Sequence, residues 1–165
     1  MRPPKRNLVD PTAAESQAAE GAATLRQSRD KPGVLVVDDD HLVRIMVQLG
    51  LERNGFDFWL ASGGREAIRL YRKHRDNITV VLLDSCMPGL DGLQTLEALR
   101  ELKPEVRACF MSGDAGIDDP AGLRQRGAAC VIAKPFHLED LTNVLRLVAQ
   151  GLPADPLPAG GTCHV

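Results

Sequence analysis

The stretch Val80–Gly89, VVLLDSCMPG, places four aliphatic residues directly before an aspartate. A short apolar run that ends in turn residues is typical of a strand buried on both faces. Asp84 is the one charged residue of this stretch, and a carboxylate at the end of a buried strand suggests a function. In open parallel sheets, binding sites form beyond the carboxyl ends of the strands. The stretch therefore predicts a central strand that delivers Asp84 to a functional edge.

The same pattern continues on both sides of this stretch. Short β-branched or apolar runs predict strands at 34–40, 56–62, 79–84, 106–113 and 129–135. Helical patterns separate them and follow the last one. Apolar residues recur at helical spacing after the first strand (Leu42, Ile45, Met46, Leu49) and in 92–102 (Leu93, Leu96, Leu99, Leu102). This alternation predicts an α/β fold with a doubly wound parallel sheet and helices on both faces.

Composition divides the chain into three parts. Residues 1–32 contain few large apolar side chains and are expected to form a disordered N-terminal arm. Residues 33–150 carry the alternating pattern and are expected to form one domain. Residues 151–165 are rich in proline and glycine, and they predict a flexible C-terminal tail.

Charge and cysteine content limit the class of protein. The chain has 44% hydrophobic and 25% charged residues and a formal net charge of −2, so it has no basic excess for nucleic-acid binding. None of its four cysteines forms a C-x-x-C pair, and no apolar run is long enough to cross a membrane. We expect a cytoplasmic protein that binds neither nucleic acid nor membrane.

Several chemically active side chains follow the predicted strands. Asp38, Asp39 and Asp40 end the first strand, and Asp84 ends the third. Ser112 and Lys134 end the fourth and fifth. Clustered carboxylates stay ionised together only beside a cation, and oxygen ligands suit Mg²⁺. A hydroxyl and an ammonium on the same edge suit a phosphoryl group. Asp40 and Asp91 are assigned as helix caps or turn residues instead.

Four segments, VLVVDDD, VVLLDSCMPGLDG, CFMSGDA and VIAKPF, occur in this order between about 34 and 150. Together they resemble the receiver domain of two-component response regulators. The resemblance implies a flavodoxin-like (CheY-like) five-stranded parallel sheet of strand order 2-1-3-4-5. It also implies a phosphoryl group donated by a sensor histidine kinase or a histidine phosphotransfer protein.

The resemblance also implies a role for each matching residue. Asp84 corresponds to the phospho-accepting aspartate, Lys134 to the lysine that pairs with the phosphoryl group, and Ser112 to the hydroxyl that donates to it. Asp39 corresponds to a direct Mg²⁺ ligand and Asp38 to one that acts through water, with Asp84 and the backbone carbonyl of Cys86 completing the metal site. The Lys134–Pro135 bond is expected to be cis.

Two features depart from the family pattern. Val131 stands where many receivers have an aromatic switch residue, which puts the usual readout in doubt. No output domain is recognisable after residue 150, so a stand-alone receiver is expected. Its output is then binding of an unknown protein on the face near the fourth and fifth strands and the last helix, or transfer of the phosphoryl group. Turnover of a metabolite is not expected.

Three alternatives remain at this point. A pseudo-receiver would keep the fold and act only as an interaction surface, without phosphorylation. A haloacid-dehalogenase-type phosphatase would use Asp38 as nucleophile and Asp40 as acid/base, but would leave VVLLDSCMPGLDG unexplained. A flavodoxin-like cofactor binder would need a hydroxyl- and glycine-rich loop where this chain has three acids.

Overall fold

The computed structural model describes residues 31–113 and 120–157. The description below concerns the unit Pro32–Val165. The predicted N-terminal arm, the loop segment 114–119 and residues 158–165 lie outside the described residues, apart from positions 31 and 32 of the arm.

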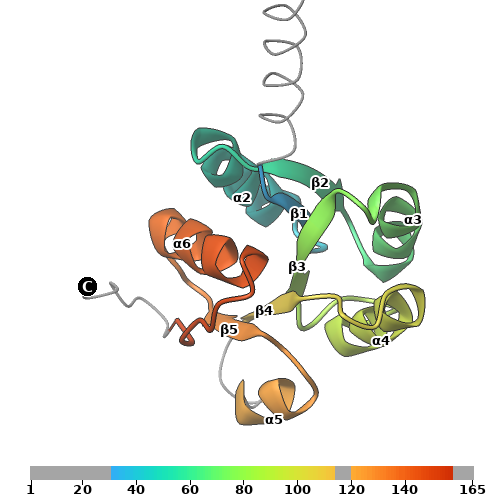
Figure 1. Cartoon of the computed structure of the whole chain (residues 1–165). Helices are drawn as coiled ribbons and strands as arrows, with labels where there is room; N and C mark the ends of the chain where they lie inside the picture. The colour runs from blue at the N-terminus through green and yellow to red at the C-terminus, as the bar shows by residue number, and fades with distance from the viewer. Residues whose placement is uncertain (1–30, 114–119, 158–165) are drawn as a thin grey trace, which may run out of the picture. The chain divides into compact units, whose positions relative to one another are not determined.

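Five strands alternate with five described helices (Figure 1). In chain order they are β1 (Gly33–Val37), α2 (His41–Arg53), β2 (Asp57–Ala61), α3 (Gly64–His74), β3 (Ile78–Asp84), α4 (Gly92–Leu102), β4 (Ala108–Ser112), α5 (Pro120–Gln125), β5 (Cys130–Ala133) and α6 (Leu138–Ala149). All strand pairs are parallel, and the sheet has the order β2-β1-β3-β4-β5. The predicted fold class and strand order are confirmed.

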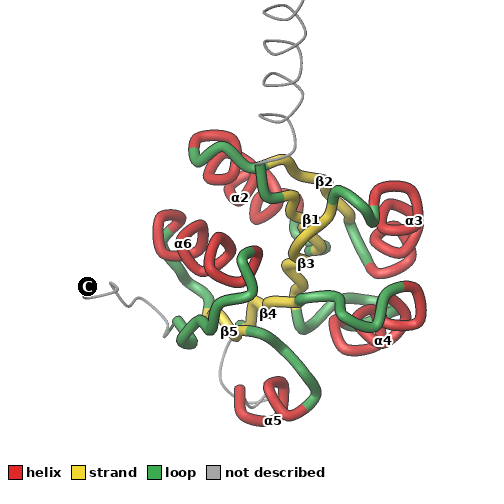
Figure 2. The backbone as a smooth tube through the Cα atoms, in the orientation of Figure 1, coloured by secondary structure: helices red, strands yellow, loops and turns green. Residues whose placement is uncertain are grey.

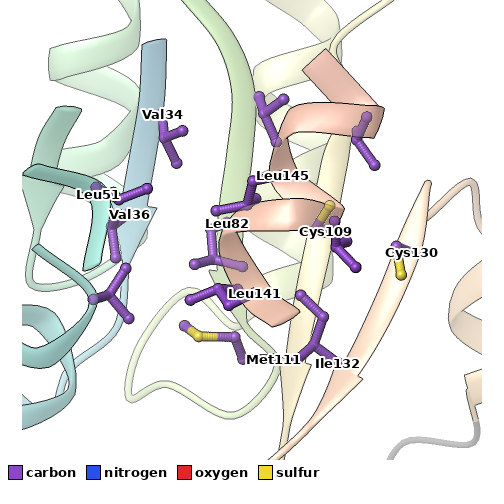
Figure 3. Packing of buried hydrophobic residues seen from close by; sticks show 14 of the residues in the cluster. Val34, Val36, Leu51, Leu82, Cys109, Met111, Cys130, Ile132, Leu141 and Leu145 are labelled. Atoms are coloured by element: carbon purple, nitrogen blue, oxygen red, sulfur yellow. The ribbon is translucent and has the colours of Figure 1, made fainter. Parts of the chain in front are cut away.

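Helices cover both faces of this sheet (Figure 2). On one face, α2 and α6 pack on a core that includes Val36, Leu82 and Ile132 (Figure 3). On the other face, α3, α4 and α5 pack on a second core that includes Leu83 and Phe110. Because β3 lies in the centre, its side chains point into both cores, which explains the uninterrupted apolar run before Asp84.

Short polar residues start two of the helices after the strands. The side chain of Asp40 caps α2 by accepting the N–H of Leu42 at 2.8 Å. Asp91 caps α4 in a reciprocal arrangement with Gln94, in which each side chain accepts the backbone N–H of the other residue. Both aspartates therefore have the capping role that the sequence predicts, and both helices begin close to the carboxyl edge of the sheet.

The apolar residues that predict α2 do not form its buried face. Leu42 is 74% exposed, and Ile45, Met46 and Leu49 are also exposed. The buried side of α2 carries Val47, Gly50 and Leu51 instead. The spacing predicted the helix correctly, but helical spacing alone does not say which of two apolar stripes meets the core. No helix in the described parts of the chain is long and apolar enough to cross a membrane.

The packed part of the chain continues beyond the predicted boundary at residue 150. Ala154 and Leu157 are buried in the core on the α6 side of the sheet. Leu157 also forms a parallel bridge with Ile132 of β5. The chain therefore stays in contact with the domain as far as residue 157, because two apolar side chains and a strand edge hold the segment that follows the expected boundary.

Candidate functional site

The predicted site residues lie together at the carboxyl edge of the sheet. Asp38 directly follows β1, Asp84 ends β3, Ser112 ends β4 and Lys134 directly follows β5. The parallel register places these strand ends side by side, since Asp84 lies opposite Met111 and Ser112 lies opposite Ala133. The side chains come from four separate parts of the sequence, and the sheet alone brings them together.

Lys134 connects the two buried carboxylates. Its Nζ donates to Oδ2 of Asp38 at 2.8 Å and to Oδ1 of Asp84 at 2.9 Å. Asp38 is 1% exposed and Asp84 is 6% exposed, whereas the Lys134 side chain is 24% exposed. The ammonium thus reaches from the surface into a pocket of two acids, and solvent screens these ion pairs far less than surface pairs.

The first strand end is also held by its own backbone contacts. Oδ1 of Asp38 accepts the N–H of Asp40 at 2.8 Å. The guanidinium of Arg44 donates to the carbonyl oxygens of Asp38, at 2.6 Å, and Asp39, at 3.0 Å. These bonds fix the loop between β1 and α2, and they bring a second positive charge close to the acids. The sequence did not predict this role of Arg44, because an arginine on a helix ordinarily lies in solvent.

Burial and charge change the proton affinities in opposite ways. Desolvation raises the pKa of Asp84 above its ordinary value, and the hydrogen bond and charge of Lys134 oppose this only in part. For Lys134, burial works to lower the pKa, but its hydrogen bonds to Asp38 and Asp84 outweigh burial and raise it. The site therefore favours the charged form of Lys134, whereas burial disfavours the ionised form of Asp84.

The net negative charge of the acidic cluster favours binding of a divalent cation. Oxygen atoms of Asp38, Asp39 and Asp84 all lie within 4.8 Å of one another. The Lys134 ammonium and the nearby Arg44 guanidinium offset two of these three carboxylate charges, so the cluster stays net negative. An all-oxygen, partly exposed set of carboxylates is the kind of donor set that Mg²⁺ prefers. Cys86, whose carbonyl was predicted as a further ligand, lies two residues after Asp84 and is exposed.

Ser112 lies at the same edge and faces the loop that follows β4. It is 8% exposed, and its Oγ donates weakly to the carbonyl of Gly113 at 3.4 Å. Its own carbonyl accepts the N–H of Lys134 at 2.7 Å. The backbone of Ser112 is therefore tied to Lys134, while within residues 31–113 and 120–157 its hydroxyl makes only this long contact. The peptide bond between Lys134 and Pro135 is cis, as the resemblance implied.

A pocket lies directly beside the acids. Its lining residues are Val43, Met46, Gly113, Lys134, Pro135 and Phe136. The pocket is bordered by α2 on one side and by the segment after β5 on the other. A binding partner could therefore reach Lys134 across a mainly apolar surface.

Comparisons with known proteins agree with this geometry. Residues 34–146 match the family model described as "Response regulator receiver domain". The transcriptional regulatory protein PrrA of Mycobacterium tuberculosis is 37% identical over 110 residues, which are 67% of this chain and 46% of PrrA. Sporulation initiation phosphotransferase F of Bacillus subtilis is 26% identical over 113 residues, covering 68% of this chain and 90% of that protein.

Solved structures show the same architecture. The Vibrio cholerae chemotaxis protein CheY4 is similar with a TM-score of 0.66 and 28% identity, over 72% of this chain and 98% of that one. A CheY-like receiver domain protein of Methanospirillum hungatei reaches 0.63 with 32% identity, over 73% and 95% of the two chains. The chain spans about half the length of the first curated relatives it matches. The chain belongs to the family of receiver domains of two-component response regulators.

Proposed function

We propose that this receiver accepts a phosphoryl group on Asp84 in a Mg²⁺-dependent reaction, with a phosphohistidine of a sensor kinase or phosphotransfer protein as donor. The observation that carries the proposal is the placement of Lys134, whose ammonium lies 2.9 Å from Asp84 inside an acidic cluster. A phosphotransferase from Bacillus subtilis that is similar over 90% of its length supports the same reaction class.

Asp84 is suited to act as the nucleophile. Its pKa is raised mainly by burial, so its carboxylate is poorly solvated and more reactive toward phosphorus. One carboxylate oxygen attacks the phosphorus, and a new O–P bond forms as the P–N bond to the donor histidine breaks. The departing imidazole nitrogen takes up a proton. The product is an aspartyl phosphate at the end of β3.

Lys134 and Ser112 are placed to hold the transferred group. Lys134 bridges Asp38 and Asp84, so a phosphoryl group on Asp84 would be a stronger partner for its ammonium than a carboxylate. Among the described residues, the Ser112 hydroxyl has only the 3.4 Å contact to Gly113, and this donor would be available to a phosphoryl oxygen. When bound to Asp38, Asp39, Asp84 and the Cys86 carbonyl, Mg²⁺ would offset the negative charge of the phosphoryl oxygens.

Intact-protein mass after incubation with acetyl phosphate, with and without Mg²⁺, tests the proposal. Wild type is expected to gain one phosphoryl group only with Mg²⁺, and Asp84→Asn is expected to gain none. Asp91→Asn is the matched control, because asparagine also caps helices and Asp91 lies outside the acidic cluster. An adduct that persists in Asp84→Asn would contradict Asp84 as the acceptor.

Two rival functions are distinguished by separate observations. A pseudo-receiver would show no adduct and no change of its amide NMR spectrum with beryllofluoride and Mg²⁺. A haloacid-dehalogenase-type phosphatase would need Asp40 as acid/base, but the Asp40 carboxylate caps α2. We propose no metabolite turnover for this chain, only its own phosphorylation and dephosphorylation. The output would be altered binding of a protein partner, or transfer of the phosphoryl group to a histidine.

A further inference from the structure

The last described residues of the chain pair with the outer edge of β5. The N–H of Leu157 donates to the carbonyl of Val131 at 3.2 Å, and the N–H of Ala133 donates to the carbonyl of Leu157 at 2.9 Å. These two bonds form the parallel bridge between Ile132 and Leu157. Because β5 is the edge strand of the sheet, the segment occupies the position of a sixth strand. We call residues 154–157 the C-terminal cover.

Side chains hold the C-terminal cover on both sides of the sheet edge. Ala154 and Leu157 are 8% and 4% exposed and join the core beneath α6. From α5 on the opposite face, the guanidinium of Arg124 donates to the carbonyl of Ala154 at 3.1 Å. The thiol of Cys130 donates to the carbonyl of Asp155 at 3.1 Å. The cover therefore contacts α5 and the core beneath α6, and its backbone lies against the Cys130 thiol.

A defined turn directs the chain from α6 to this edge. Gly151 has a positive φ of 78°, which favours glycine. The N–H groups of Gly151 and Leu152 bond back to the carbonyls of Val148 and Leu147, as in a Schellman motif. The guanidinium of Arg107, just before β4, donates to the carbonyl of Ala149 at 2.6 Å. These bonds therefore fix the end of α6, from which the chain leads to the cover.

Prolines limit the cover to a single bridge. Leu157 stands between Pro156 and Pro158, and neither proline has an N–H to donate. The segment can satisfy the β5 edge at one residue, but it offers a poor edge for any further strand. Unpaired strand edges are sites at which other chains add strands. A proline-flanked segment on such an edge blocks this addition.

We propose that the β5 edge is a binding site for an extended peptide of a partner protein, and that the C-terminal cover occupies this site in cis. The contacts of the cover define the partner segment: an extended strand parallel to β5, with an apolar side chain at the position of Leu157 and a small one three residues before it. The partner can bind only when the cover detaches.

The backbone of β5 links this edge to the acidic site. Two consecutive N–H groups point to opposite sides: Ala133 donates to Leu157 of the cover, and Lys134 donates to Ser112 at 2.7 Å. Phosphorylation that shifts Ser112 or Lys134 would therefore weaken or strengthen the hydrogen bonds between β5 and the cover. This coupling rests on the proposed phosphorylation, whereas the cis occupancy does not.

The reactivity of Cys130 measures cover release. Each cysteine of the full chain is followed by maleimide labelling and peptide mapping. Cys86 is exposed and serves as the labelled reference, while Cys109 lies in the core and reports global unfolding. Leu157→Asp is expected to raise the labelling rate of Cys130 roughly tenfold with Cys109 still protected, because it places a charge in a buried position. Leu152→Asp, at a 49% exposed position, is the matched control and should leave the rate unchanged.

A second variant keeps the test decisive if Leu157→Asp unfolds the domain. Arg124→Gln removes the bond to Ala154 and also the positive charge that lowers the pKa of the Cys130 thiol. Loss of that charge alone slows labelling, so the expected several-fold faster reaction of Cys130 reports release of the cover. In Leu157→Asp, a synthetic peptide with the sequence LPADPLP at millimolar concentration should protect Cys130 again. The proposal is overturned if wild-type Cys130 is labelled as fast as Cys86, or if no variant changes its rate. Protection of wild-type Cys130 that depends on protein concentration would show that a second copy supplies the cover.

Adding beryllofluoride and Mg²⁺ to wild type tests the coupling separately. A faster Cys130 reaction would support release upon loading. An unchanged rate, with NMR shifts at Ser112 showing that the site is loaded, would overturn the coupling and leave a static cover. Absence of any shift at Ser112 would count against the proposed phosphorylation and not against the cover.

Discussion

The Nζ of Lys134 lies 2.9 Å from Oδ1 of Asp84, although 50 residues separate them in the sequence. Even so, the pKa of Asp84 is raised, because burial and the nearby charges of Asp38 and Asp39 outweigh this contact. The ionised form of Asp84 therefore lowers the stability of the folded state, as is common for reactive groups.

Asp84→Asn should raise the melting temperature of the metal-free protein at neutral pH. A carboxyl whose pKa is raised by folding destabilises the folded state at every pH above its ordinary value of 3.8. Replacing it with a neutral amide of the same shape removes this penalty. Thermal unfolding in EDTA measures the difference. A lower melting temperature than wild type would mean that the bond to Lys134 dominates.

The pH dependence provides a control for this prediction. As the pH falls through the raised pKa of Asp84 toward its ordinary value of 3.8, the metal-free wild type should gain stability relative to Asp84→Asn, so the two melting temperatures should converge. Parallel curves over the whole acidic range would show that burial of the charge is not the cause.

Lys134→Met should destabilise the metal-free domain by about 3 kcal/mol, because it leaves two buried carboxylates without their shared cation. Urea unfolding at neutral pH measures the loss, and Mg²⁺ should restore part of it. The pKa of Lys134 is raised, so its stabilising effect is complete below the ordinary value of 10.5 and is lost as the pH rises through the folded value. Wild type should therefore lose its advantage over Lys134→Met only at strongly alkaline pH.

A double-mutant cycle separates the two effects. The double variant Asp84→Asn/Lys134→Met should be less destabilised than the sum of the single changes. In the Asp84→Asn background, Lys134→Met leaves only one buried carboxylate without its cation instead of two. Additive changes would show that Lys134 interacts mainly with Asp38. The methionine keeps the length of the side chain, so lost packing does not explain the difference.

Gly92→Ala should destabilise the fold by about 2 kcal/mol through overpacking. An added Cβ at Gly92 would collide with the backbone oxygen of Asp84 and would lie 2.9 Å from the ring of Phe110. Gly63→Ala is the matched control at the start of α3, since a Cβ there meets no atom within 4 Å. Urea unfolding of both variants checks the prediction, and equal stabilities would contradict the close approach of α4 to Asp84.

The sheet edge could be predicted from sequence because a polar residue marks the end of each of these strands. In Val80–Asp84 and in the segments that end at Asp38, Ser112 and Lys134, an apolar run stops at a polar residue. Parallel strands must place these ends on one edge, so the candidate site follows from the order of the elements. The distances within the cluster could not be predicted, because they depend on the twist of the sheet and the reach of Lys134.

Other features depend on contacts that no local pattern contains. The segment 151–157 is rich in proline and glycine and reads as a tail, yet the edge of β5 lies within its reach and accepts Leu157. Arg44 reads as a solvated helical residue, yet the loop carbonyls of Asp38 and Asp39 lie beside it. In both cases a distant or irregular backbone supplies the partner, and composition carries no information about it.

The two apolar stripes of α2 should differ sharply in their contribution to stability. Leu49 is 45% exposed, so Leu49→Glu should change the free energy of unfolding by no more than about 0.5 kcal/mol. Leu51 is fully buried, and Leu51→Ala should cost about 3 kcal/mol because it leaves a cavity between α2 and the sheet. Urea unfolding at two protein concentrations measures both. A large, concentration-dependent loss in Leu49→Glu would show that the exposed stripe is covered by a second copy of the chain, whereas a small and constant one would show that the stripe is free in the monomer.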